Sequence, residues 1–287
     1  MPCGGLETPA TAGQETGATG SSRVQEMRAK LGAMCGRYGR RADKQRIAEW
    51  FRTRDTDVFN EEYYETNAAR FAPSYNIAPE SMQPVVRVDR DTGERVLTLM
   101  KWGLVPYWSK TPRANFSSIN ARADKLTSSG AWREPWKHRR CLIPANFFYE
   151  WEPLTKDAEK KKISKPCAVS LPDEGLFAFG GIWDRWKGQN AEKNETGKNE
   201  IDKNEIVVES FSIITTDPNE LLEPFHNRCP LIIKPDDYGR WLAPAEPAHL
   251  PIDLVRTWPA EDMKAWRVAK LQGNGPHLLE PLAESSA

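Results

Sequence analysis

The chain has 287 residues, among them 11 tryptophans, which is enough apolar material for one sizeable core or two small ones. Lys and Arg together number 40 and so do Asp and Glu, so the formal net charge is zero and any binding to a polyanion must come from a local patch. The five cysteines form no C-x-x-C pair, which argues against a structural zinc site, and no apolar run approaches the roughly 20 residues of a membrane helix.

Residues 1–33 differ in composition from everything that follows them. Gly, Thr, Ala and Ser dominate the first part of this segment, with hardly any large apolar side chain. Such a segment cannot bury enough surface to offset the entropy lost on ordering, so we predict a disordered extension. Met27 and Met34 are both candidate starts of translation. We expect a folded domain over residues 34–282 and a flexible tail over residues 283–287.

The first predicted elements of the folded domain are a helix and a hairpin. Residues 43–51 predict a short helix, because their apolar side chains share one face and an aspartate lies near the start. The apolar runs 85–88 and 96–100 flank the turn Asp91-Thr92-Gly93 and predict a β-hairpin. The very polar stretch 188–205 predicts a solvated hairpin tip.

Strands outnumber helices in the rest of the domain. Further strands are predicted at residues 141–143, 177–183, 211–216 and 231–233, and further short helices at residues 218–222 and 235–242. These elements lack the regular alternation of βαβ units, so the predicted fold class is α+β with a mostly antiparallel core.

Cys35 is the first residue that can carry chemistry. If translation starts at Met34, the small side chain of Cys35 allows removal of the initiator methionine, which exposes a 1,2-aminothiol. With an aldehyde, such as that of a ring-opened abasic deoxyribose, the amine can form an imine and the thiol can close on the same carbon to give a thiazolidine. The pKa of an α-amine, about 7.7–8.0, makes it a usable nucleophile near neutral pH. The alternative is that Cys35 is a small buried residue before a glycine turn.

Two further clusters combine polar groups with strand-like context. Asn120 and Arg122 lie two apart on an extended segment and project to the same side, where the amide can orient an amine or sugar and the guanidinium can bind a phosphate. Alternatively, Asn120 satisfies the hydrogen bonding of a loop and Arg122 lies in solvent. Glu150 lies among the aromatic residues of the run 147–151, where poor solvation raises a carboxyl pKa and suits proton transfer. Its alternative is an exposed carboxylate at the edge of a strand, beside Glu152.

Histidine, tryptophan and basic residues supply the remaining candidates. His226 can act as an acid or base near neutral pH, although most lone histidines are not catalytic. The run 102–108 (WGLVPYW) supplies rings on which exposed bases of a single strand can stack, unless these rings lie in the core. Basic residues can supply positive charge for binding a single strand, or they can simply form a solvated face. They are Arg113, Arg122, Lys125, Arg133, Lys137, Arg139 and Arg140. Cysteines in apolar contexts are interpreted as structural: Cys141, Cys167 and, in the core or at its rim, Cys229.

Six motifs in this order resemble those of the SRAP family, the SOS response-associated peptidase or abasic-site processing proteins. They are MCGRY at 34–38, YNIAP at 75–79, WGLVPYW at 102–108, INAR at 119–122, RCLIPANFFYEW at 140–151 and HNRCP at 226–230. The resemblance runs from Met34 to about Pro281. Several motifs in the right order over nearly the whole predicted domain make it highly specific.

The resemblance implies a single compact domain with a barrel-like β core, short peripheral helices and a groove for single-stranded DNA. In that family an N-terminal cysteine links covalently to abasic sites and shields them. Carried over by motif, the resemblance implies that Cys35 is the covalent residue and that Asn120 positions its amine and the sugar. It also implies that Glu150 assists ring opening and proton transfer, and that His226 acts on the sugar hydroxyl or in reversal.

The resemblance also implies which residues contact DNA. Arg37 and Arg122 would hold phosphates, Trp108 would stack or wedge at the abasic gap, and Thr215 would help line the site. The expected partner is single-stranded DNA that contains abasic sites, with no cofactor, no metal and no membrane. We expect a monomer of the cytoplasm that is associated with the nucleoid when bound to DNA.

Two other functions remain open from the sequence. One is a cysteine peptidase that uses Cys35, His226 and Glu150 on itself or on other proteins. The other is a non-covalent reader of single-stranded DNA. As written, the nitrogen of Cys35 belongs to an amide and cannot form an imine. Covalent capture therefore requires either translation from Met34 or a cut at the Met34–Cys35 bond, and we favour translation from Met34.

Overall fold

The computed structural model describes residues 36–113, 118–152, 165–193 and 199–282. The extension over residues 1–33, the tail over residues 283–287 and Cys35 itself lie outside these ranges, so the predictions about them remain predictions. Within the described ranges, no helix is both long and apolar enough to cross a membrane.

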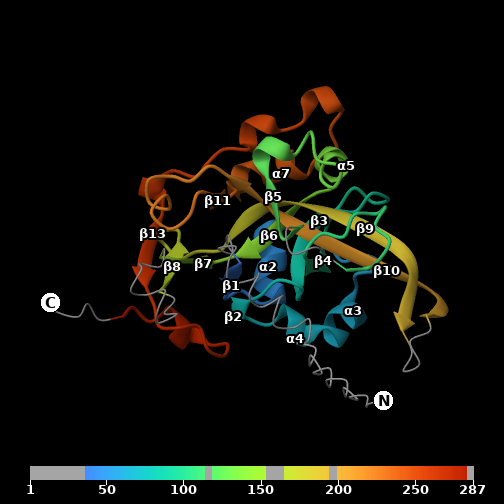
Figure 1. The fold of residues 1–287 in the computed structure, drawn as a ribbon, viewed down its shortest axis with the longest axis horizontal. Helices are drawn as coiled ribbons and strands as arrows, with labels where there is room; N and C mark the ends of the chain where they lie inside the picture. Colours follow the sequence, from blue (N-terminus) through green and yellow to red (C-terminus); the bar gives the residue numbers. More distant parts are fainter. Residues whose placement is uncertain (1–35, 114–117, 153–164, 194–198, 283–287) are drawn as a thin grey trace, which may run out of the picture. The chain divides into compact units, whose positions relative to one another are not determined.

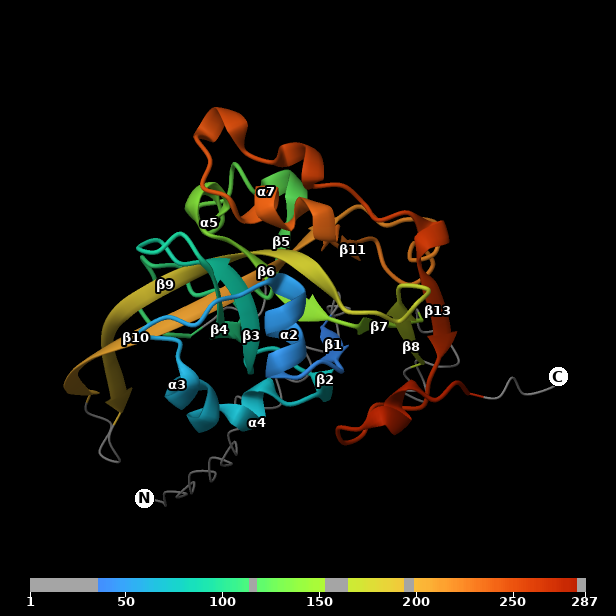
Figure 2. The same cartoon turned by 180° about the vertical axis from the view of Figure 1, so that it is seen from behind.

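The strands of the described ranges form two sheets, shown from opposite sides in Figures 1 and 2. The five-stranded sheet has the order β13 (Lys264–Arg267), β8 (Pro166–Ser170), β7 (Phe147–Trp151), β1 (Arg37–Arg40) and β2 (Ser74–Ile77). The eight-stranded sheet has the order β11 (Cys229–Pro230), β10 (Asn199–Thr216), β4 (Arg95–Trp102), β3 (Met82–Val88), β6 (Arg140–Ala145), β9 (Phe177–Lys193) and β12 (Ile232–Ile233), with β5 (Asn120–Arg122) paired to β10.

The eight-stranded sheet closes on itself. β10 pairs with β4, β4 with β3, β3 with β6 and β6 with β9, and β9 pairs in turn with β10. The pairs in this ring are antiparallel except β10–β4. Its strands approach closely, since a Cβ on Gly181 of β9 would lie 2.8 Å from the carbonyl oxygen of Ser212 on β10, and glycine leaves that room. The predicted α+β class with a mostly antiparallel, barrel-like core and short peripheral helices is confirmed.

The helices are short. They are α2 (Lys44–Phe51), α3 (Glu61–Thr66), α4 (Ala68–Phe71), α5 (Arg133–His138) and α7 (Tyr238–Leu242), with 3-10 turns η2 (Ala123–Lys125), η3 (Pro235–Asp237), η4 (Pro247–His249), η5 (Ile252–Leu254), η6 (Ala260–Asp262) and η7 (Pro276–Leu279). The start of α2 follows from Asp43, whose carboxylate accepts the backbone N–H of Arg46 at 2.9 Å. Ile47 and Phe51 are the buried residues of this helix, so its amphipathic pattern holds it to the core.

Most predicted elements are present, and one is wrong. The predicted helix 43–51 is α2, the predicted hairpin is β3–β4, and the predicted strands lie in β6, β9, β10 and β12. Residues 218–222 form a turn and not a helix, and the side chain of Asn219 bonds both this turn and a distant segment. Its Oδ1 accepts the N–H of Leu222 at 3.0 Å, and its Nδ2 donates to the carbonyl of Trp258 at 2.9 Å.

Three apolar clusters hold these layers together. The helix-side core joins the eight-stranded sheet to the helices through residues that include Ile47, Phe51, Tyr64, Trp136 and Trp241. The inter-sheet core takes residues from both sheets, among them Tyr38, Trp102, Phe148, Phe179, Phe211, Ile213 and Cys229. The outer cluster lies on the other face of the five-stranded sheet and includes Phe147, Tyr149, Ala168 and Val268.

Gly39 in β1 has no room for a side chain. A Cβ there would lie 2.0 Å from Cζ of Phe147, whose buried ring also contacts Tyr149 edge to face. We expect Gly39→Ala to lower the free energy of unfolding by about 1–3 kcal/mol, the usual range for overpacking, as measured by urea titration. Gly130→Ala is the matched control, because no atom lies within 4 Å of the added methyl group. Equal stability of the two variants would contradict the close contact.

Candidate functional site

The chain enters β1 next to Glu150. Arg37 pairs with Tyr149 in an antiparallel register, which sets the preceding residue, Gly36, across from Glu150. Gly36 is buried and is bonded directly to Cys35 in the chain. Cys35 lies outside the described residues, but the backbone that leads to it starts at the level of the Glu150 carboxylate.

Glu150 is buried beside the inter-sheet core. Its side chain is 1% exposed, and strand alternation places it on the same face of β7 as Phe148, a member of that core. Burial, and in second place the charge of Glu150, raise the pKa of the Cys229 thiol to about 12, so the two groups are close. The alternative in which Glu150 is an exposed edge carboxylate is therefore wrong. Cys229 lies in the core and stays a neutral thiol near pH 7, unsuited to be a second nucleophile.

Asn120 and Thr215 lie on neighbouring strands and point to the same core. β5 runs parallel to β10, with Asn120 opposite Ile213 and Arg122 opposite Thr215. Ile213 belongs to the inter-sheet core, so alternation along both strands turns Asn120 and Thr215 to that side. Both are almost fully buried, and Thr215 Oγ1 has no hydrogen-bond partner among the described residues. A buried hydroxyl in this state is a site where a bound group can supply the missing bond.

His226 lies near the end of β10. It follows the turn built on Asn219, and its backbone N–H donates to the carbonyl of Leu222 at 2.9 Å. Three residues later Cys229 pairs with Thr216, so the HNRCP motif runs back along the same end of β10 that carries Thr215. His226 is half-buried. The register therefore brings the segments of Asn120, Thr215 and His226 to one end of the inter-sheet core.

A chain of ion pairs borders this end of the strands. Arg122 projects to the same side as Asn120, as predicted, but its guanidinium already binds both oxygens of Asp124 at 3.0 and 2.9 Å. This pair lowers the pKa of Asp124 to about 2. Arg228, a buried residue that the sequence reasoning did not select, binds Asp124 at 3.2 Å and Asp217 at 3.0 Å. Its position in the HNRCP motif, two residues after His226, was the feature of the sequence that pointed to it.

Arg37 is separated from Glu150 by the five-stranded sheet. It pairs with Tyr149, whose side chain belongs to the outer cluster, so both side chains lie on the face opposite Glu150. Its guanidinium donates to Oδ1 of Asn76 at 2.9 Å, a residue of the YNIAP motif that the sequence reasoning also left without a role. The assignment of Arg37 to a phosphate stays a prediction.

The aromatic run 102–108 divides between core and surface. Trp102 is fully buried, whereas Trp108 is 57% exposed. Two hydrogen bonds hold the loop on either side of Trp108. Asp184 accepts the N–H of Tyr107 at 3.0 Å, and Trp186 Nε1 donates to the carbonyl of Ser109 at 2.8 Å. Trp108 is therefore an exposed ring on an anchored loop, as its predicted stacking role requires.

Two of the basic residues suggested for DNA have structural partners instead. Arg140 is buried and donates to the carbonyls of Trp136, Lys137, Trp241 and Ala243. Arg139 forms an ion pair with the buried carboxylate of Asp184 at 3.1 Å. In the described part of the chain, no group of three or more His, Cys, Asp or Glu is arranged to hold a metal ion.

Comparison with known proteins places the chain in a family. Residues 34–274 match the family described as SOS response associated peptidase (SRAP). The chain is 34% identical over 253 residues to the abasic site processing protein YoqW of Bacillus subtilis (strain 168), a match that covers 86% of the chain and 99% of YoqW. It is 29% identical over 277 residues to the abasic site processing protein HMCES of Gallus gallus, with 87% of the chain and 78% of HMCES covered.

Solved structures share the fold. A protein from Bacteroides thetaiotaomicron is similar with a TM-score of 0.68 at 23% identity, over 87% of this chain and 100% of that one. A protein from Bordetella bronchiseptica is similar with a TM-score of 0.59 at 20% identity, over 82% of this chain and 100% of that one. With a family match over most of its length and a relative above 30% identity, the chain belongs to the SOS response associated peptidase (SRAP) family.

Proposed function

We propose that this protein captures abasic sites in single-stranded DNA through a covalent bond from Cys35, once Cys35 is the first residue of the chain. The proposal is carried by the buried polar groups Asn120, Glu150 and Thr215, which face the inter-sheet core, and by the start of β1, where Gly36 lies across from Glu150. Burying such groups costs free energy, and sites of chemistry are where proteins keep them. The family membership and the names of YoqW and HMCES, both abasic site processing proteins, support the same substrate.

The reaction joins an aldehyde to a 1,2-aminothiol. The α-amine of Cys35 adds to C1′ of a ring-opened deoxyribose, and loss of one water gives the imine. The thiol then adds to the same carbon while its proton passes to the nitrogen, which closes a five-membered thiazolidine. Water is the only by-product. An α-amine with a pKa of about 7.7–8.0 is partly unprotonated near neutral pH, so no cofactor is needed.

The buried polar residues divide the remaining tasks. Asn120 orients the amine and the sugar through its amide, and Thr215 completes its hydrogen bonding with the bound sugar. Glu150 transfers protons during ring opening and imine formation, a task suited to a carboxyl group in a poorly solvated place. His226 acts on the hydroxyl group that ring opening releases.

A peptidase step on the chain itself is a second candidate activity. The family description names a peptidase, and release of Cys35 from preceding residues is a peptide cleavage. We propose that this cut, where it is needed, occurs at the Met34–Cys35 bond and serves to free the amine. Cleavage of unrelated peptides without DNA would instead support a general peptidase.

Removal of the thiol tests the covalent step. Cys35→Ala should abolish adducts with an abasic oligonucleotide that survive denaturing gels, while affinity for an intact strand stays the same. Cys35→Ser should give only adducts that hydrolyse, since an oxazolidine is less stable in water than a thiazolidine. The matched control is a chain that retains residues 1–34, verified by mass spectrometry, which should form no stable adduct. Equal yields for wild type and Cys35→Ala would point to a lysine Schiff base.

Neutralising Glu150 tests the proton-transfer step. Glu150→Gln is nearly isosteric and should slow crosslinking of bound DNA by about 100-fold or more, because general acid–base catalysis contributes this much. Affinity for an intact strand should be unchanged or slightly higher. Glu152→Gln is the matched control, since that carboxylate pairs with Arg267 at 2.6 Å and has no assigned task. Weaker binding with an unchanged crosslinking rate would make Glu150 structural and move its role to His226.

Truncation of Trp108 tests the stacking assignment. Trp108→Ala should weaken binding of an intact single strand by about 1–3 kcal/mol, the usual contribution of one stacked base, with little change in the dependence of affinity on salt. Fluorescence anisotropy at several salt concentrations measures both quantities. Trp50→Ala, which removes a partly exposed indole from α2, should leave affinity unchanged. A flatter salt dependence for Trp108→Ala would show that the loop acts through charge.

A further inference from the structure

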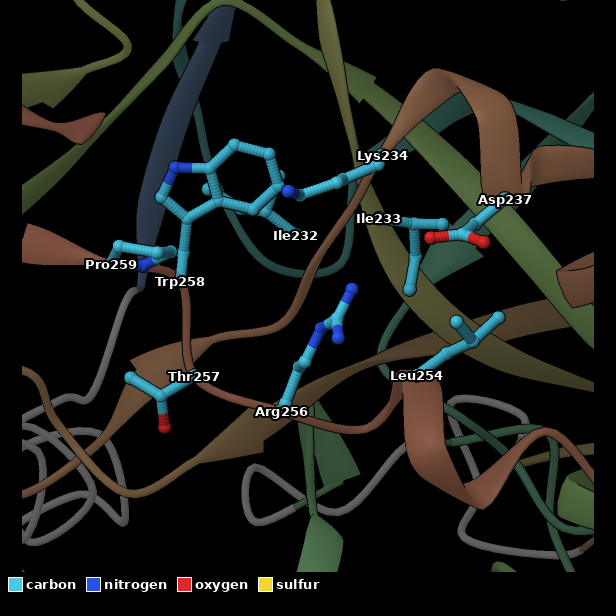
Figure 3. Close-up of a pocket in the computed structure, with 9 residues that line it drawn as sticks. All are labelled: Ile232, Ile233, Lys234, Asp237, Leu254, Arg256, Thr257, Trp258 and Pro259. Carbon is cyan, nitrogen blue, oxygen red and sulfur yellow. The ribbon is translucent and has the colours of Figure 1, made fainter.

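A small pocket lies next to β12, away from the residues proposed for the reaction with the sugar. It has a volume of about 240 Å³ and is bounded by β12, by the end of η5 and by the coil that leads to η6 (Figure 3). Pockets for drug-sized ligands measure roughly 300–1,000 Å³, so this one has room for a single small polar unit. The residues that give it chemical character are Lys234, Asp237, Arg256 and Trp258.

Two cations and an aromatic ring face this pocket. The guanidinium of Arg256 points into its centre from the coil, and Lys234 reaches toward the indole of Trp258 (Figure 3). The Lys234 ammonium lies 5.7 Å from the centroid of that ring. In the described ranges, neither Lys234 nor Arg256 forms an ion pair, while nearby Asp253 is held by Arg240 at 2.7 and 2.5 Å. The pocket therefore presents two cations that form no ion pair among the described residues, with Asp237 as the one carboxylate of its lining.

The wall of this pocket also supports the candidate site. The carbonyl of Trp258 accepts from Nδ2 of Asn219 at 2.9 Å, and its side chain packs against the inter-sheet core, which contains Cys229. The charge of the Glu150 carboxylate helps to raise the pKa of the Cys229 thiol, so these two groups are close. The pocket wall and Glu150 thus both lie against the inter-sheet core.

We propose that this pocket binds one nucleotide of the DNA strand that carries the abasic site. Arg256 and Lys234 hold its phosphate, and the ring of Trp258 contacts the attached sugar or base, a combination of charge and ring that suits single strands. Asp237 on the opposite wall repels a second phosphate and limits the pocket to one unit. This subsite rests on the proposed function, since the abasic site fixes which nucleotide reaches it.

Salt-dependent binding tests the two cations. With a fluorescent intact oligodeoxynucleotide, Arg256→Ala and Lys234→Ala should each weaken binding by about tenfold or more, as for loss of one charge-assisted contact. Each should also flatten the slope of log affinity against log salt by about 0.7. Arg46→Ala, which removes an exposed cation from α2, is the matched control and should change neither. Slopes for the pocket variants equal to that of Arg46→Ala would overturn the subsite.

Photocrosslinking tests contact with Trp258. Oligodeoxynucleotides with 5-iododeoxyuridine at successive positions on either side of the abasic site should give, at one position, an adduct that maps to the Trp258 peptide. Trp258→Phe should reduce this adduct and retain the fold. Adducts that map only to Trp108 at every position would overturn the subsite. The proposed function fails separately, if wild-type protein that begins at Cys35 forms no denaturant-resistant adduct with the same abasic strands.

Discussion

The pairing of β10 with four other strands is the interaction on which the candidate site depends. β9 and β4 hold the central part of β10 within the closed ring, and β5 and β11 pair with its last residues. β5 carries Asn120 and β11 begins at Cys229, so one strand sets the position of both. A slip of β5 by one residue would turn Asn120 away from the inter-sheet core. The closure that makes the barrel therefore also assembles the site.

The apolar packing of the inter-sheet core reaches the polar site directly. Trp102 stacks on Phe211 of β10 with an angle of 5° between the rings, and its Nε1 donates to the carbonyl of Ile119 at 3.0 Å. Ile119 directly precedes Asn120, so a core tryptophan fixes the backbone that presents the amide. The hydroxyl of Ser212 similarly binds the carbonyl of Ser118. Rigid packing of this kind holds polar groups in a fixed geometry, as preorganised catalysis requires.

Local patterns in the sequence were enough to predict much of this fold. The helix 43–51 has its own cap and apolar face, and the hairpin around residues 91–93 has a turn between two apolar runs, so both depend on neighbours in the chain. The helix predicted at 218–222 failed, because the side chain of Asn219 makes a bond to Trp258 that no local pattern contains. Closure of the ring by β9 and β10 likewise depends on contacts between distant segments.

For the candidate site, too, the sequence predicted some features and distant contacts decided others. Glu150 and Asn120 could be selected from the sequence, because a polar residue inside an apolar strand is costly unless it has a task. That both face the inter-sheet core could not be predicted, since it follows from the registers of β7 with β1 and of β5 with β10. The face on which Arg37 lies and the capture of Arg122 by Asp124 are also register effects. Residue type predicted the chemistry, and strand pairing decided the geometry.

The balance of charge gives the proposed covalent bond a physical purpose. Several cations of the described structure are already paired: Arg122 and Arg228 with Asp124, and Arg139 with Asp184. Few phosphate contacts release few counter-ions, so under the proposed function we expect a chain with zero net charge to bind an intact strand weakly. Weak binding leaves undamaged single strands free for other proteins. At an abasic site, in the proposed reaction, the thiazolidine sets the lifetime of the complex, so non-covalent affinity only has to bring Cys35 and the aldehyde together.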